Sequence, residues 1–286
     1  MVKFDILTYY SRIAPFLNSF LKGKELAVKT LIPNGPRLLK RGTILPKLYI
    51  NELNSKNITK QFIELRKTKH LKEVKPQLTK NQLKLWGYFI PRKYSELLYA
   101  TNNETPGKKI DRIFFDIDRV NLSPEKAQKI TLELLTLIKK DKKFKKLVKF
   151  KPIILWTGSS FHIYLLLNKK VSNSFYNKYI QYSKKDHLKN FTGIWINEIS
   201  KHSHIKIKGG HEKTKGYITI DPSQTPSGKL ARAPFSLHLK DANTIDGICL
   251  PLSESQLKDK KLIKTLKSYT IEKVLKNIAS LSKQLK

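Results

Sequence analysis

Residues 113–118 read Ile-Phe-Phe-Asp-Ile-Asp, an apolar run that ends in two acids one residue apart. The apolar run predicts a buried strand. Because side chains alternate between the two faces of a strand, we expect Asp116 and Asp118 on the same face. Two carboxylates this close raise each other's pKa unless a cation neutralises them. The same spacing also occurs at solvated strand ends and turns, so the pair alone leaves a metal site and a simple turn both open.

The segments after this strand alternate between strand and helix patterns. Ser123 and Pro124 suit the start of a helix, as the N-cap and the first helical residue. Gly193 is a candidate break in a later helix. The patterns predict three more strands and two helices, at residues 152–156, 161–167 and 216–221 and at residues 124–138 and 174–200. In this β-α-β-β-α-β order the first and third strands are central, and the fourth lies beside the first.

This strand order brings a third acid to the pair. Asp221 ends the strand at residues 216–221, beside the strand of Asp116 and Asp118. Three converging carboxylates suit Mg²⁺ or Mn²⁺, which prefer oxygen ligands. Two such ions about 4 Å apart activate an attacking hydroxyl and neutralise a leaving pyrophosphate. Asp221 could instead only cap the turn that it opens with Pro222 and Ser223.

Two further stretches carry groups that bind phosphate. Residues 157–160 form a turn of small residues whose N–H and hydroxyl groups suit triphosphate oxygens, and His162 follows that turn. Residues 229–238 add arginine, lysine, serine and histidine side chains. A core histidine and a basic surface loop are the plainer interpretations of these two stretches.

The charge of the chain predicts a nucleic-acid partner. Its 57 Lys and Arg residues outnumber 22 Asp and Glu residues, for a formal net charge of +35. A field of this size attracts phosphates. An AT-rich genome would favour lysine over arginine, but it does not account for the excess of basic over acidic residues.

The remaining composition narrows the class of protein. Cys249 is the one cysteine, so we expect no internal disulfide, no cysteine zinc site and no iron–sulfur site. No apolar stretch approaches the ~20 residues of a membrane span, and no signal segment opens the chain. We therefore expect a soluble cytoplasmic protein, associated with the nucleoid of an archaeal or bacterial cell, and no membrane partner.

Taken together, these motifs resemble the archaeo-eukaryotic primase superfamily. Its catalytic subunits carry a D-x-D strand, a small-x-H turn and a third aspartate, which residues 116–118, residues 160–162 and Asp221 resemble. Residues 232–238, Arg-Ala-Pro-Phe-Ser-Leu-His, match the R-x-P-x-S-L-H of archaeal primase small subunits completely. The resemblance implies that this chain is such a catalytic domain.

The N-terminus resembles another branch, the polymerase domain of bacterial end-joining ligases. Residues 9–15 and 21–29 are similar to its Y-Y-x-x-V-A-P and L-x-G-R-P-L-x-x-K-R patterns. Lys3 matches a lysine that this branch uses near a DNA 5′-phosphate. The chain departs from both branches, because Ser159 replaces a basic residue of the phosphate turn, and the His-Pro-Trp motif and the cysteine zinc module are absent.

The resemblance implies an α/β (α+β) primase-polymerase core. We expect an N-terminal αβ module at residues 1–105, which begins with a helix over residues 6–21 and ends in a loop at residues 101–107. A split-βαβ, RRM-like catalytic unit at residues 106–251 packs against it, and a helical tail follows at residues 252–286. We expect the active site between the two modules.

The resemblance also implies the roles of the site residues. Asp116, Asp118 and Asp221 would be catalytic and hold two Mg²⁺ or Mn²⁺ ions. Nucleoside triphosphates are the expected substrates, and single-stranded DNA template and primer the expected partners. A primase large subunit or a further C-terminal domain is a candidate partner. The expected nucleotide-binding residues are Thr157, Ser159, Ser160, His162, Lys229, Arg232, Ser236 and His238.

Three functions stay open at this stage. The first is a DNA primase, a DNA-directed nucleotidyltransferase that begins short primers on single-stranded DNA. The second is a gap-filling end-joining repair polymerase, which needs a primer. The third is a non-catalytic nucleic-acid-binding protein. The R-x-P-x-S-L-H match favours the first, and the three retained carboxylates argue against the third.

Overall fold

The computed structural model describes residues 5–102 and 109–286. Lys3 and most of the predicted loop at residues 101–107 lie outside the described residues. The chain divides into two compact units: unit 1 comprises Met1–Ala100, Leu230–Cys249 and Tyr269–Lys286, and unit 2 comprises Thr101–Lys229 and Leu250–Ser268. This division differs from the expected three consecutive segments, because the chain returns to unit 1 twice.

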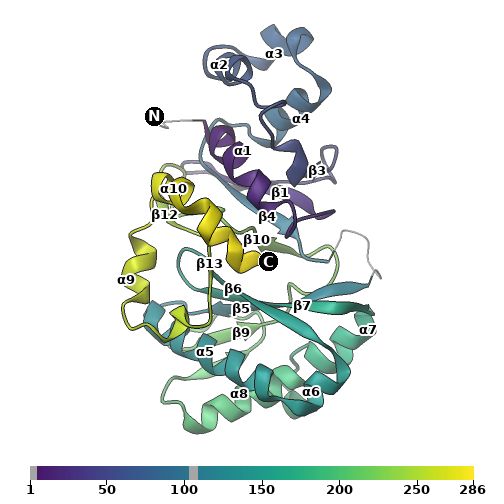
Figure 1. Ribbon diagram of the computed structural model, residues 1–286, viewed down its shortest axis with the longest axis vertical. Helices are drawn as coiled ribbons and strands as arrows, with labels where there is room; N and C mark the ends of the chain where they lie inside the picture. The colour runs from purple at the N-terminus through teal and green to yellow at the C-terminus, as the bar shows by residue number, and fades with distance from the viewer. Residues whose placement is uncertain (1–4, 103–108) are drawn as a thin grey trace. The chain divides into compact units, whose positions relative to one another are not determined.

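Unit 2 is built on a six-stranded sheet with the order β13-β6-β7-β5-β9-β8. The expected central pair of strands and the fourth strand beside the first are confirmed, as β7, β5 and β9. Two edge strands, β8 and β13, were not predicted. Figure 1 shows α5 (Pro124–Lys140), α6 (Lys142–Leu147) and α8 (Phe191–His202) gathered on one face of the sheet. The strands are β5 (Ile110–Asp118), β6 (Phe150–Trp156), β7 (Phe161–Val171), β8 (Ile207–Gly209), β9 (Ile218–Asp221) and β13 (Leu250–Leu252).

Side-chain N-caps mark the starts of several helices of unit 2. Ser123 caps α5 (Pro124–Lys140), with Pro124 in the first turn, as predicted. The predicted break at Gly193 is wrong. The interruption comes earlier, and Gly193 lies in the first turn of α8 (Phe191–His202), where a Cβ would come within 1.7 Å of the His187 carbonyl oxygen. The other helices are α6 (Lys142–Leu147), α7 (Asn173–Phe175) and α9 (Leu262–Lys267).

Unit 1 is built on a second sheet, in which β1 is flanked by β2, β3 and β4, and β10 pairs with β4. β10 returns to this sheet from far along the chain, which explains why residues 230–249 belong to unit 1. The strands are β1 (Glu25–Leu31), β2 (Arg37–Lys40), β3 (Leu48–Tyr49), β4 (Ser95–Ala100) and β10 (Leu230–Arg232), with a hairpin of β11 (Leu237–Leu239) and β12 (Ile245–Ile248).

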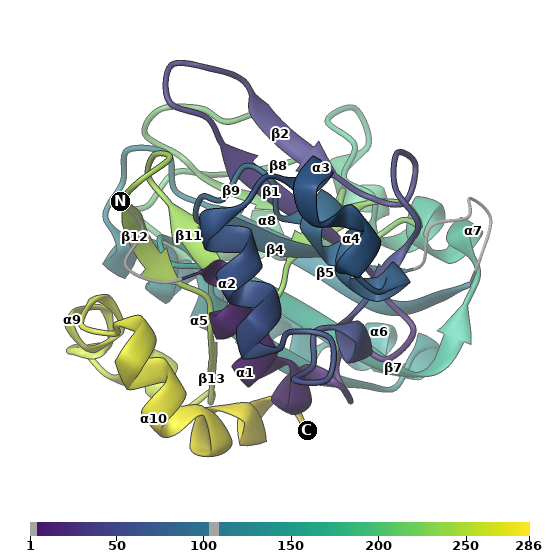
Figure 2. The same cartoon turned by 90° about the horizontal axis from the view of Figure 1, so that it is seen from above.

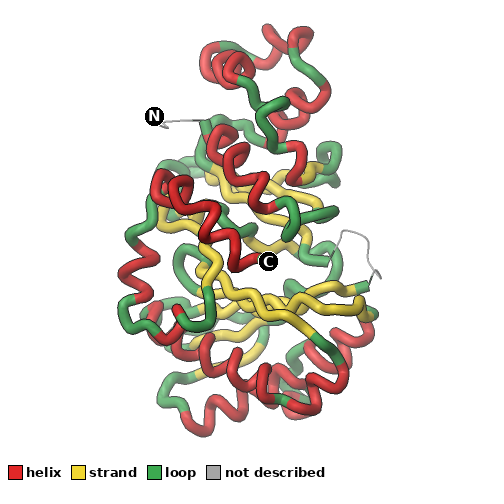
Figure 3. The backbone as a smooth tube through the Cα atoms, viewed as in Figure 1, coloured by secondary structure: helices red, strands yellow, loops and turns green. Residues whose placement is uncertain are grey.

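The helices of unit 1 come from both ends of the chain. The predicted N-terminal helix is α1 (Ile6–Leu17), which the Asp5 carboxylate caps. α10 (Ile271–Ser282) lies beside α1 (Figures 1 and 2), so the expected helical tail is divided between the two units. The colours of Figure 3 separate these helices from the sheet. The remaining helices are α2 (Lys60–Thr68), α3 (Leu71–Val74) and α4 (Lys80–Tyr88). Among the described residues, none of the helices combines the length and apolar character of a membrane span.

Asn102 fixes the start of β5, the strand of Asp116. Its side-chain oxygen accepts hydrogen bonds from the backbone N–H groups of Asp111 (2.8 Å) and Arg112 (3.1 Å). Its amide donates to the carbonyls of Arg112 (2.7 Å) and Thr225 (2.5 Å). Asn102 is fully buried, so water cannot replace its side chain as the hydrogen-bond partner of these backbone groups.

Asn102→Ala should destabilise the protein by about 3 kcal/mol, because it leaves buried backbone groups without a partner. Urea denaturation measures this loss. Asn168 is exposed, and Asn168→Ala should change the free energy of unfolding by no more than about 0.5 kcal/mol. Equal stability of the two variants would contradict the role assigned to Asn102.

Candidate active site

Asp116 lies between two functional side chains in the sheet of unit 2. On one side its Cα partner is His162 of β7, and on the other it is Asp221 of β9. Asp118 pairs with Thr219, two residues along the same strand. Because directly paired residues share a face, the three aspartates and His162 lie on one face of the sheet. The convergence that the sequence predicts is therefore present in the backbone register.

His162 contacts Asp116 directly. The His162 Nε2 atom lies 3.4 Å from an Asp116 carboxylate oxygen. The imidazole is buried, with its edge against the Phe114 ring at 4.7 Å between centroids, and its Nδ1 lies 3.5 Å from the Tyr164 hydroxyl. These contacts orient the ring with one nitrogen toward the acids.

Asp221 is a buried carboxylate in a like-charged setting. Burial raises its pKa, hydrogen bonds from Ser223 lower it, and the neighbouring Asp116 raises it again. The Ser223 N–H and hydroxyl each lie 2.8 Å from an Asp221 oxygen. The sequence left open whether Asp221 caps a turn or joins the acids, and the structure shows both.

The Asp118 carboxylate forms an ion pair with a lysine of this chain. The Lys213 ammonium lies 2.5 Å from an Asp118 carboxylate oxygen. Among residues 5–102 and 109–286, no three His, Cys, Asp or Glu side chains are gathered closely enough to hold a metal ion as they stand. The donor set nevertheless fits a hard cation, because it consists of carboxylate oxygens on paired strands, two of which interact unfavourably when both are charged.

The turn from β6 to β7 is tied to the strand of the acids. Thr157 and Ser160 close the turn through two hydrogen bonds of 2.8 and 3.0 Å, and Gly158 takes the φ of +101° that the turn requires. The Ser160 hydroxyl donates to the Ile117 carbonyl of β5. Arg119, which follows β5, donates from Nε to the Ser159 carbonyl at 2.7 Å. A basic side chain therefore lies at this turn although Ser159 itself is not basic.

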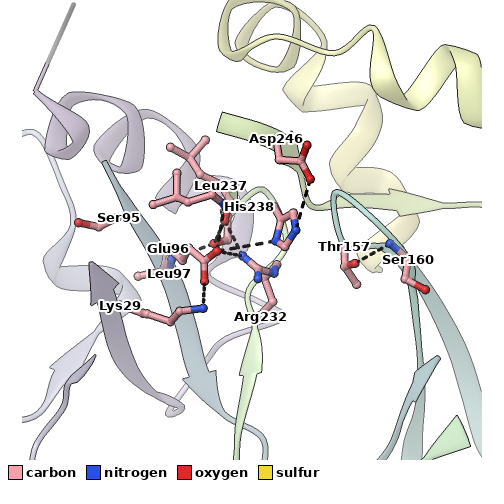
Figure 4. Close-up of polar contacts among 12 residues, drawn as sticks. Lys29, Ser95, Glu96, Leu97, Thr157, Ser160, Arg232, Leu237, His238 and Asp246 are labelled. Carbon is pink, nitrogen blue, oxygen red and sulfur yellow. Dashed lines mark hydrogen bonds and ion pairs between the residues drawn. The ribbon is translucent and has the colours of Figure 1, made fainter. Parts of the chain in front are cut away.

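The residues of the R-x-P-x-S-L-H match belong to unit 1, where Arg232 and His238 contact Glu96 of β4 (Figure 4). Arg232 Nη1 lies 3.0 Å and His238 Nδ1 3.7 Å from one Glu96 oxygen, and the Lys29 ammonium lies 2.6 Å from the other. We call Glu96, Lys29, Arg232 and His238 the Glu96 cluster. His238 Nε2 also lies 3.7 Å from Asp246.

The charges of the Glu96 cluster are set by this packing. Burial works to raise the pKa of Glu96, but Arg232 and Lys29 outweigh it and lower that pKa to about 2. Burial, with Arg232 adding to it, lowers the pKa of His238 to about 4. At neutral pH the cluster therefore holds an ionised Glu96, two cations and a neutral imidazole.

Ser236 and Lys229 take up different positions from the rest of the predicted set. The Ser236 hydroxyl is buried, accepts from the Leu97 N–H at 2.8 Å and donates to the Leu237 carbonyl at 3.0 Å. The Lys229 side chain is exposed, and its carbonyl accepts from the Thr101 N–H at 3.0 Å. Both residues thus make contacts that stabilise the fold.

Sequence reasoning missed several residues around these groups. Glu96, Lys213 and Arg119 belong to no recognisable motif, and each contacts a residue distant from it in sequence. His211 belongs with these residues, because its charge lowers the pKa of Asp221. One signal was available for Glu96, which stands in a largely apolar strand. A glutamate is almost never buried unless it is paired, so its position indicated a buried basic partner.

The fold has a counterpart among solved structures. The chain is similar to the polymerase domain of Mycobacterium tuberculosis Ligase D in complex with DNA, with a TM-score of 0.57 and 14% sequence identity, over 96% of this chain and 88% of that chain. No protein-family model and no curated protein sequence matches the chain. The likeness confirms the expected mixed α/β, primase-polymerase-like fold.

The low pKa of His238 predicts a pH-dependent stability. The imidazole takes up a proton near pH 6.5 in the unfolded chain and near pH 4 in the folded chain. The free energy of unfolding therefore falls as the pH drops from 6.5 toward 4, and this histidine causes no loss of stability above pH 6.5. Urea denaturation at pH 7.5 and at pH 4.5 measures this loss as the difference between the two free energies of unfolding. His238→Gln should make that difference smaller by about 2 kcal/mol. His202→Gln, at a side chain 78% exposed, serves as the control and should leave the loss unchanged. Identical losses in wild type and His238→Gln would contradict the assignment.

Proposed function

We propose that this protein is a DNA-directed nucleotidyltransferase that joins nucleotides on a single-stranded DNA template. The observation that carries the proposal is the position of Asp116, flanked by Asp221 on one neighbouring strand and His162 on the other. Polymerising enzymes need carboxylates close enough to share divalent cations, beside donors for phosphate oxygens. The direct pairing of Asp116 with Asp221 and the contact of His162 with Asp116 support such a site.

Asp116, Asp118 and Asp221 are the residues that would hold Mg²⁺ or Mn²⁺. Bound ions would lower the pKa of a 3′-hydroxyl and neutralise charge on the phosphates. To take part, Asp118 exchanges its ion pair with Lys213 for another cation, which costs little because the Lys213 side chain is 66% exposed. Asp221 is already held in place by Ser223.

His162 and the turn at residues 157–160 would bind the triphosphate. His162 offers a ring N–H beside the acids, and Arg119 adds a positive charge at the turn. The hydroxyls of Thr157 and Ser160 are engaged within the protein, so the exposed contribution of the turn comes from its backbone and from Ser159. We therefore expect charged groups and backbone N–H groups, more than hydroxyls, to donate hydrogen bonds to the phosphates.

We assign phosphate binding in unit 1 to Arg232. Its Nη1 is held by Glu96 at 3.0 Å and by the Leu237 carbonyl at 2.6 Å, which fixes the plane of the guanidinium. A fixed guanidinium loses less entropy on binding an anion than a free one. His238, neutral at pH 7, would donate or accept a hydrogen bond rather than supply charge.

The completeness of the R-x-P-x-S-L-H match at residues 232–238 favours the priming function over gap filling. All three polar members of that motif are built into unit 1 around β4, through Glu96 or the backbone of Leu97. Gap filling would draw on a 5′-phosphate site, for which Lys3 was the sequence candidate. The net charge of +35 supports a nucleic-acid partner in either case.

Asp116→Ala should lower nucleotide incorporation by about a thousandfold, because it removes the central carboxylate of the three. Incorporation of labelled nucleotides on circular single-stranded DNA, in Mg²⁺ or Mn²⁺, measures the effect. Template binding should be retained. Asp186→Ala, at an exposed acid of the same unit, should keep full activity.

The same assay separates the three functions when it is run with and without an annealed primer. Product without a primer supports the priming function, and product only with a primer favours the repair polymerase. A template that is bound but never copied would leave a non-catalytic binding protein. Incorporation that persists in Asp116→Ala would contradict the proposed site.

A further inference from the structure

A lysine-lined groove lies at the end of the unit 2 sheet that is remote from the carboxylates. Its volume is about 280 Å³. It is formed where α6 leads into β6 and where β7 ends, and the Asn168 N–H donates to the Lys149 carbonyl at 3.0 Å across it. We call it the distal groove. Its lining includes Lys146, Lys149 and Lys169 together with Leu147, Val148 and Val171.

The distal groove combines positive charge with exposed apolar surface. Lys146, Lys149 and Lys169 are all exposed, and none of them forms an ion pair with a carboxylate of the described residues. Leu147 is 44% exposed, which is unusual for so large an apolar side chain. Ammonium groups beside an open apolar contact suit a ligand with both phosphates and flat bases.

The surroundings of the distal groove strengthen its positive field. Asp141 is the one acid between residues 139 and 151, and it is already used: its carboxylate caps α6 at Phe144 N and accepts from Trp195 Nε1, each at 2.9 Å. Further exposed lysines lie near the lining residues in sequence, at Lys140, Lys142, Lys143, Lys145 and Lys170. No other acid of residues 139–151 offsets this field.

The distal groove is separate from the candidate active site. His162 stands at the start of β7 beside Asp116, and Lys169 stands near the end of the same strand. The seven residue steps from His162 to Lys169 span about 23 Å at the rise of an extended strand. One nucleotide at the carboxylates therefore cannot also occupy the distal groove.

We propose that the distal groove binds the backbone of single-stranded nucleic acid as a second site, away from the carboxylates. The lysines contact the phosphates and Leu147 contacts a base. An acidic protein or an anionic lipid surface would also meet the charge, but a groove that sets lysines beside the exposed Leu147 fits a strand of phosphates and bases better than a broad surface. The proposal goes beyond the proposed catalysis and does not require it.

The test is fluorescence anisotropy with a labelled 20-nucleotide oligo-dT in EDTA, so that no divalent ion bridges the strand to the carboxylates. The variant is Lys146→Ala/Lys149→Ala/Lys169→Ala. Lys260→Ala/Lys264→Ala/Lys267→Ala removes the same charge from exposed positions elsewhere in unit 2 and is the control.

The groove variant should bind about tenfold more weakly at 0.1 M salt, and its salt slope should fall by about 2, as expected for three lost phosphate contacts. The control should bind within about twofold of wild type. Equal weakening in both variants would overturn the proposal, because only the overall field would then matter. The binding of both variants to anionic lipid vesicles is measured as well. A groove variant that binds DNA as the wild type does, but no longer binds the vesicles, would also overturn the proposal. Since the assay contains no nucleotide or metal, loss of catalysis in Asp116→Ala is scored independently.

Discussion

The hydrogen-bond register of β5 between β7 and β9 is the constraint on which the candidate site depends. Asp116 has His162 opposite it on one side and Asp221 on the other, so the ladder brings an imidazole and two carboxylates together. A slip of one residue would turn Asp116 to the other face of the sheet. Asn102, which binds the start of β5, and the Ser160 hydroxyl, which binds its end, hold this register at both ends.

The two units handle buried charge in opposite ways. In unit 1, Glu96 is almost fully buried, but Lys29 and Arg232 compensate it, which keeps it ionised and fixes the arginine. In unit 2, Asp116 and Asp221 are directly paired as like charges, and the Ser223 hydrogen bonds and the charge of His211 lower the pKa of Asp221. A charge-compensated anion suits a structural anchor, whereas two like-charged carboxylates on paired strands suit a site that recruits cations.

The sequence predicted the centre of unit 2 well, because each of its signals is local. The alternation at residues 113–118, the cap at Ser123 and the small-residue turn at residues 157–160 each act within a few positions. The Glu96 cluster could not be predicted in this way, since Glu96 meets Lys29 and Arg232 only after β10 returns to β4. The break assigned to Gly193 failed for a similar reason: glycine there serves a close approach to His187, a tertiary contact that no local pattern shows. The roles of the site residues remain predictions.

The most direct test of the central claim is a count of Mn²⁺ ions bound by the protein, read from the electron paramagnetic resonance signal of free Mn²⁺ during titration with a non-hydrolysable nucleoside triphosphate present. The carboxylates of β5 and β9 predict about two tightly bound ions in the wild type. Asp116→Ala should lose both, while Asp186→Ala should bind as the wild type does. Equal Mn²⁺ binding in all three proteins would contradict the account.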